Sequence, residues 1–371
     1  MLPLESGPMT VGTHRSPREE LQARIAHGRS SQAYGVYERA RDWVLEVGAS
    51  GSGERAERPS EYWTEELEML DYMLDASPLV VEKLRQHTYT VTGIRAYDYR
   101  RGKNSERLAE KLSALVELGG SELLVPEAPA LGGFGFEIDG ALYNIDTLKY
   151  YEAMIALERG AVLAGFRQPS RRRIVVEIGP GWGGFPYQFK TLFPDVTYVL
   201  VDLPELFLFS ATYLQTVFPE ARMVFLDDAH SLSGDEWLDY DFVIVPHTHV
   251  DRLTPPYLDL TVNMVSFQEM TAEQVDGYVR KAFELGSPFL YSLNRERSYY
   301  NEELESVTEI LDRYYWPRVV PVLPVAYTNM LDQKKKAPKP PGKRSEKESS
   351  KQPRKPTLEY KHVIGTRRVA P

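Results

Sequence analysis

The 371-residue sequence contains no cysteine, which excludes disulfide bonds and thiolate metal sites. It also lacks any run of about 18 apolar residues, the length that a membrane-spanning helix needs. The first residues carry Glu5, His14 and Arg15 without an apolar stretch, so we predict no secretory signal and a cytoplasmic location. The net charge of −9 argues against general nucleic-acid binding by the folded part of the chain.

The composition changes along the chain and predicts three parts. Residues 1–30 are polar and rich in Gly, Ser, Pro and Arg, and predict a disordered arm. Residues 31–130 carry apolar side chains at helical spacing, such as Tyr34, Tyr37 and Val44, and predict a mainly helical domain. We interpret this domain as either a lid over a binding site or a dimerisation element. Residues 131–371 then form the third part.

The third part is organised around a glycine-rich stretch. The apolar residues 174–176 predict a buried strand that runs into Glu177 and then Gly179, Gly181 and Gly183. A glycine turn lets a ligand approach the backbone closely. The turn lacks the G-K-[ST] of a phosphate loop, and an acid before the glycines repels a pyrophosphate. This context favours a cationic ligand such as S-adenosylmethionine, which carries a sulfonium and an ammonium group.

Further short apolar runs alternate with helical segments. Residues 197–201 end in Asp202, about 20 residues after the glycines, where doubly wound folds place the acid that binds ribose hydroxyls. Residues 223–226 end in Asp227 and Asp228, which could face the adenine amino group. Two more runs cover 242–245 and 289–293. This alternation predicts a parallel sheet with its ligand at the carboxyl ends of the strands.

These residues resemble a class I methyltransferase, and in particular the sugar O-methyltransferases. The resemblance covers roughly residues 130–330 and depends on four strings: 133–136 with 147–151, 177–185, 201–205, and Asn263 followed by 268–270. It implies an α/β Rossmann-like sheet with helices on both faces and S-adenosyl-L-methionine as cofactor. The cofactor-binding residues would be Glu177, Gly179, Gly181, Gly183, Asp202, Leu203, Asp227 and Asp228.

Methyl transfer to a sugar hydroxyl requires a group that removes the hydroxyl proton. His247 and His249 follow the 242–245 run, where a base would face the methyl group, and Glu269 belongs to the family-like string. A divalent ion such as Mg²⁺ could assist instead, with Asp251 and Glu269 as candidate ligands. The alternative is that each of these side chains has only a structural role, in a polar loop or in a hydrogen bond.

Residues 333–356 differ from the rest of the chain. They contain ten Lys or Arg and two Glu, a net +8, with five prolines and no large apolar residue. Because class I methyltransferases end in an antiparallel hairpin, we predict a disordered insert in the hairpin turn. If the insert binds anything, its charge favours an anionic partner.

The leading hypothesis is an S-adenosylmethionine-dependent O-methyltransferase acting on a sugar or a glycosylated metabolite. The same fold could instead methylate a non-sugar natural-product hydroxyl. A nicotinamide oxidoreductase and a non-catalytic cofactor-binding scaffold are the rivals from other classes. The sequence leaves open the oligomeric state, including a homo-oligomer.

Overall fold

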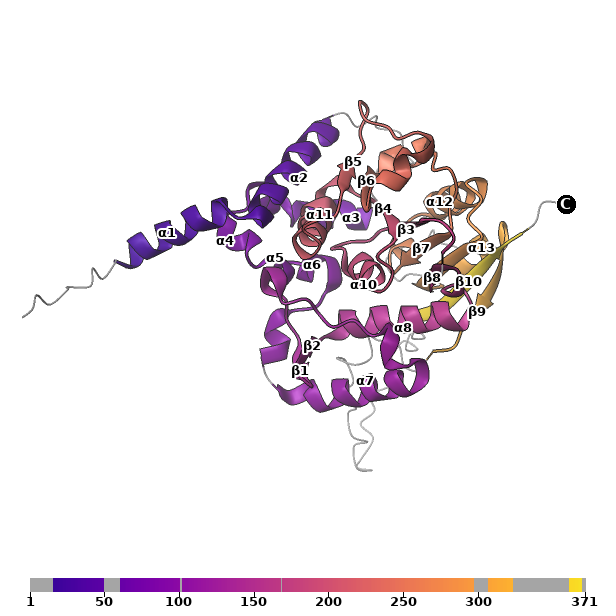
Figure 1. Ribbon diagram of the computed structural model, residues 1–371, viewed down its shortest axis with the longest axis horizontal. Helices are drawn as coiled ribbons and strands as arrows, with labels where there is room; N and C mark the ends of the chain where they lie inside the picture. The colour runs from indigo at the N-terminus through magenta and orange to yellow at the C-terminus, as the bar shows by residue number, and fades with distance from the viewer. Residues whose placement is uncertain are drawn as a thin grey trace, which may run out of the picture.

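A computed structural model describes residues 16–49, 61–100, 102–167, 169–296, 306–322 and 360–368. Figure 1 shows a body of mixed helices and strands from which one helix, α1, projects. The helices are α1 (Pro17–Arg29), α2 (Gln32–Ala49), α3 (Glu61–Glu68), α4 (Pro78–Val81), α5 (Leu84–His87), α6 (Tyr89–Thr92), α7 (Ser105–Gly119), α8 (Ile145–Arg159), α9 (Ala164–Arg167), α10 (Gly184–Leu192), α11 (Phe207–Val217), α12 (Ala272–Glu284) and α13 (Val307–Asp312). The strands are β1 (Phe136–Ile138), β2 (Ala141–Tyr143), β3 (Arg173–Ile178), β4 (Val196–Asp202), β5 (Met223–Phe225), β6 (Phe242–Pro246), β7 (Leu260–Met264), β8 (Phe289–Arg295), β9 (Tyr315–Val319) and β10 (Tyr360–Arg367).

The main sheet has eight strands in the order β5-β6-β4-β3-β7-β8-β10-β9. The strands from β5 to β8 are parallel, whereas β10 runs antiparallel to both β8 and β9. This order confirms the α/β sheet of the class I methyltransferase type and its closing antiparallel hairpin. Strand β3 lies at the centre, and the chain leaves it first toward β4 and later toward β7.

Successive side chains of the central strands alternate between two hydrophobic cores, as a sheet buried on both faces requires. Val175 of β3 belongs to the core under α2, α8, α10 and α11, whereas Ile174 and Val176 belong to the core under α12 and α13. Helices therefore cover both faces, as predicted.

The helical N-terminal part shares the first of these cores. The ring of Trp43 in α2 lies 5.7 Å from Phe207 in α11 and 5.2 Å from Phe225 in β5, measured between ring centroids. The predicted inward residues Tyr37 and Val44 are buried in the same cluster. The N-terminal helices thus pack directly on the sheet layer.

One expectation from the sequence needs correction. Pro17–Arg29 is a helix, although the composition of residues 1–30 predicts disorder; Ser16 and Glu19 form a capping box, and Pro17 occupies the first helical position. This helix has no buried residue, so its local capping signals and not a core explain it. Helix α8 is capped by Asn144, whose side chain accepts the backbone N–H of Thr147.

The predicted insert at 333–356 lies outside the described residues. No helix in the described ranges is both long and apolar enough to cross a bilayer.

Candidate functional site

A cavity opens at the carboxyl ends of β3, β4 and β7, where the strand order reverses. Open α/β sheets bind their ligands at such a point. Trp63 of α3 and Val91 and Thr92 of α6 line the cavity from the N-terminal side. Its empty space, including the mouth, is about 1040 Å³.

The glycine turn after β3 forms one wall of the cavity. Gly179, Gly181 and Gly183 all have positive φ angles, of 72°, 57° and 88°. A Cβ atom on Gly179 would lie 2.3 Å from the Ser266 hydroxyl oxygen, so only glycine fits at this position. Gly179 and Gly181 line the cavity, and Gly183 caps α10 behind it. The predicted strand–turn–helix is confirmed.

Asp202, at the end of β4, is joined to the turn. Its Oδ2 accepts the backbone N–H of Gly181 and its Oδ1 accepts that of Leu203, both at 2.8 Å. Burial raises the pKa of Asp202 to about 7. Each carboxylate oxygen still has a lone pair for one more donor, so the group can accept two ligand hydroxyls. Asp202 and Leu203, which were predicted to bind the cofactor, both line the cavity.

Glu177 lies at the end of β3, buried beside the turn. The hydroxyl of Tyr198 donates to its Oε2 at 2.8 Å, and burial raises the pKa of Glu177 to about 8. A bound cation would favour the ionised form of this carboxyl. Glu177 can therefore become negatively charged at the cavity wall when a cation binds beside it.

Glu269 faces the cavity from the loop after β7. The indole N–H of Trp63 donates to its Oε2 at 3.1 Å, and burial raises the pKa of Glu269 to about 8. The Trp63–Glu269 bond joins the helical part to the sheet across the cavity. Glu269 is thus a predicted base candidate that lies in the same cavity as the glycine turn and Asp202.

Buried amides hold the Glu269 loop. Asn263 donates to the Ile178 carbonyl at 2.9 Å and accepts from Asn294 at 2.8 Å. Between Asn263 and this loop, Val265 lines the cavity with a φ of 68°. That angle is an outlier for a β-branched residue, and such strain is typical of functional sites.

Of the two histidines predicted as bases, only His247 lines the cavity. His247 lines the cavity where β6 ends, but β6 is the neighbour of β4 on the side away from β7. His249 does not line it; its Nε2 lies 3.4 Å from an Asp228 carboxylate oxygen, and partial burial lowers its pKa.

The acids predicted near adenine also lie outside the cavity lining. Asp227 accepts backbone N–H groups of Ala229 and His230 at 2.8 Å, and Asp228 pairs with Arg252 at 2.6 Å. Asp251 does not line the cavity either. No group of three or more His, Asp or Glu side chains suited to a metal ion occurs within the described ranges.

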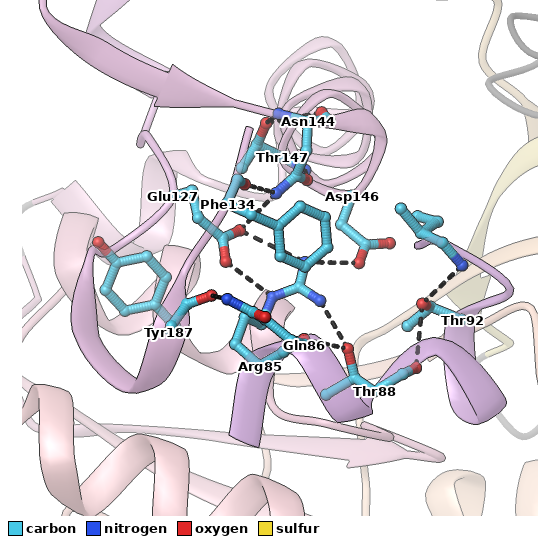
Figure 2. Close-up of polar contacts among 12 residues, drawn as sticks. Arg85, Gln86, Thr88, Thr92, Glu127, Phe134, Asn144, Asp146, Thr147 and Tyr187 are labelled. Carbon is cyan, nitrogen blue, oxygen red and sulfur yellow. Dashed lines mark hydrogen bonds and ion pairs between the residues drawn. The ribbon is translucent and has the colours of Figure 1, made fainter. Parts of the chain in front are cut away.

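Trp63 and Lys149 line the cavity, and neither was predicted from the sequence as a site residue. Lys149 is the only lysine of helix α8, which is buried over most of its length, and that was the available signal. Its Nζ lies 3.0 Å from Asp146, whose other oxygen accepts from Arg85 at 2.9 Å. Figure 2 shows the Arg85 guanidinium enclosed by Glu127, Asp146 and Thr88.

No family model and no curated protein matches this sequence. Among solved structures, EvdMO1 is similar at 15% identity and a TM-score of 0.35, over 71% of this chain and 48% of that chain. WbdD is similar at 11% identity and a TM-score of 0.36, over 60% of this chain and 39% of its own. Magnesium protoporphyrin IX methyltransferase from Synechocystis, solved with bound SAM, is similar at 10% identity and a TM-score of 0.35, over 62% and 87%. This chain spans less than half the length of the first two. We therefore infer its function from the residues of its own cavity.

Proposed function

We propose that this chain is an S-adenosylmethionine-dependent O-methyltransferase whose acceptor is a hydroxyl of a sugar or a glycosylated metabolite. The observation that supports it most is that Glu177, Asp202 and Glu269 line one cavity together with the glycine turn. The first two suit a cationic nucleoside, and the third suits proton removal.

The chain's residues fit the cofactor at both ends. Asp202 offers two acceptor oxygens for the ribose diol, and Glu177 offers a carboxylate for a positive group. His247, Gln274 and Tyr278 also line the cavity, so a planar base would meet aromatic and amide side chains there. S-adenosylmethionine would supply an electrophilic methyl group on a positively charged sulfur.

Glu269 and Trp63 fit the acceptor. An indole beside a carboxyl matches the apolar faces and the hydroxyls of a sugar ring. The chain must hold the acceptor hydroxyl in line and take its proton. The Glu269 carboxylate accepts that proton, and its raised pKa brings it near the operating range of a general base. Trp63 steadies the carboxylate by donating its N–H.

The alternatives make different predictions. A non-sugar natural-product hydroxyl would use the same groups. A non-catalytic scaffold would bind the cofactor, and Glu269→Gln would not affect its function. A nicotinamide enzyme would bind NAD in preference to S-adenosylhomocysteine. Mg²⁺ assistance would depend on Glu269 with little other protein ligation among the described residues.

The test is calorimetric titration of S-adenosylhomocysteine into wild type, Asp202→Asn and Asp228→Asn. We expect micromolar binding that weakens at least tenfold, about 1.4 kcal/mol, in Asp202→Asn. Asp228 is exposed, paired with Arg252 and outside the cavity lining, so its variant should match wild type within twofold. A folded wild type that binds no S-adenosylhomocysteine would rule out the proposal.

A further inference from the structure

The cavity has a strong imbalance of charge. Its lining holds three carboxyl groups, on Glu177, Asp202 and Glu269. Among the described lining residues, Lys149 is the only lysine or arginine. Its side chain is nearly buried, with 8% of the residue exposed, so its charge is directed to the cavity and to its neighbours and not to bulk water.

Lys149 is held in place by a buried ionic network. Asp146 lies between two cations, with one oxygen 3.0 Å from the Lys149 ammonium and the other 2.9 Å from Arg85. Arg85 in turn donates to Glu127 at 2.7 Å, and its guanidinium lies 3.7 Å from the ring centre of Trp182. Trp182 belongs to the glycine turn and lines the cavity. Arg85 therefore contacts the turn and, through Asp146, fixes the position of Lys149.

The network is balanced within itself. Arg85 and Lys149 carry two positive charges, and Glu127 and Asp146 two negative ones, if all four are ionised. A buried lysine is costly unless it is paired, so this arrangement keeps an ammonium at the cavity wall at a tolerable cost. Lys149 also opposes the rise in the pKa of Glu177 that burial causes, which places the two charges within electrostatic reach.

An acidic site that keeps one cation matches a ligand with positive groups and one negative group. S-adenosylmethionine is such a molecule, because its amino-acid tail carries an ammonium and a carboxylate. We propose that Lys149 binds the cofactor's carboxylate, with Glu177 on the side of its positive groups and with Asp146 and Arg85 as positioning residues. This inference rests on the proposed function.

The experiment compares two ligands that differ by the carboxylate alone: S-adenosylhomocysteine and its decarboxylated analogue, the adenosyl thiopropylamine. Calorimetric titrations would be made on wild type, Lys149→Met and Lys149→Arg. We expect Lys149→Met to weaken S-adenosylhomocysteine binding at least tenfold and to leave binding of the decarboxylated analogue within twofold. Lys149→Arg should recover part of the loss, because it restores the charge.

The matched control is Lys111→Met. Lys111 is also a nearly buried lysine paired with a carboxylate of α8, on Glu152, but it does not line the cavity. The Lys111→Met variant should bind both ligands as wild type does. Thermal melting would show that each variant is folded. Equal losses for both ligands in Lys149→Met, or no loss for either, would overturn the inference. Failure of wild type to bind S-adenosylhomocysteine at all would instead reject the proposed function.

Discussion

At the scale of single residues, the protonation state of Glu269 controls the proposed reaction. Only the carboxylate can take a proton, and burial raises its pKa to about 8. We therefore expect kcat/KM for methyl transfer to rise with pH and to level off above about pH 8, since this ratio reports the free enzyme. Glu269→Gln should lower kcat about 10²- to 10⁴-fold above pH 8, where the wild-type carboxylate is ionised, and leave S-adenosylhomocysteine affinity within threefold.

Trp63 allows this profile to be assigned to Glu269. Its indole N–H donates to the carboxylate and so lowers the pKa of Glu269. Trp63→Phe removes that donor and keeps an aromatic ring, so the rise in kcat/KM should move to higher pH. A profile that falls with increasing pH, or that Trp63→Phe leaves in place, would contradict the role of Glu269 as base.

At the scale of elements, Arg85 of α5 ties several segments together. It bonds Glu127 in the loop before β1, Asp146 of α8 and Thr88 before α6, and its side chain is fully buried. Arg85→Met would leave buried carboxylates without this partner. We expect a loss of about 3–5 kcal/mol in unfolding free energy, measured by urea denaturation followed by tryptophan fluorescence.

Arg24→Met is the control for that measurement. Arg24 pairs with Glu82 at 3.5 Å, but both side chains are more than half exposed, and such pairs contribute less than about 1 kcal/mol. If Arg85→Met cost no more than Arg24→Met, the network would not stabilise the fold.

The elements also show what sequence could and could not predict. The glycine turn and Asp202 were predictable because local signals specify them: a buried apolar run, glycines with forced backbone angles and an acid at a strand end. Strand β7 was missed as a strand, although its residues 260–264 are buried, because only its place beside β3 distinguishes it. That place brings Glu269, in the loop after β7, to the same cavity as the glycine turn after β3. Lys149 was missed because its partners, Asp146 and Arg85, come together only in the folded chain.

At the scale of the whole molecule, the cavity joins the two parts that composition separated. Trp63 closes it from the helical side, and one hydrophobic core continues from α2 to the sheet. Folding of the body therefore buries Glu177 and Asp202 and partly buries Glu269. Each of these carboxyl groups loses hydration when the chain folds. The free energy of this desolvation therefore lowers the stability of the whole fold and not only that of the segment that carries the group.

This burial predicts how stability depends on pH. Glu177 and Glu269 have folded pKa values of about 8, above the ordinary value of 4.5, so the folded chain holds protons that the unfolded chain releases. Unfolding free energy without ligand should therefore fall as pH rises toward 8, by up to about 1.4 kcal/mol per pH unit for each group. Above their folded pKa values this dependence ends, because both states are then ionised.

Comparison with Glu177→Gln isolates one of these groups from all others. The amide of this variant cannot ionise, so urea denaturation between pH 6.5 and 8 should show the variant gaining stability relative to wild type as pH rises. His87 and His249, whose pKa values burial lowers, are present in both proteins, so their effect on stability cancels in the difference. A difference between the two proteins that is constant across this window would show that Glu177 is already ionised in the folded chain. The buried acid would then be a permanent charge in the cavity and not one that a cationic ligand induces.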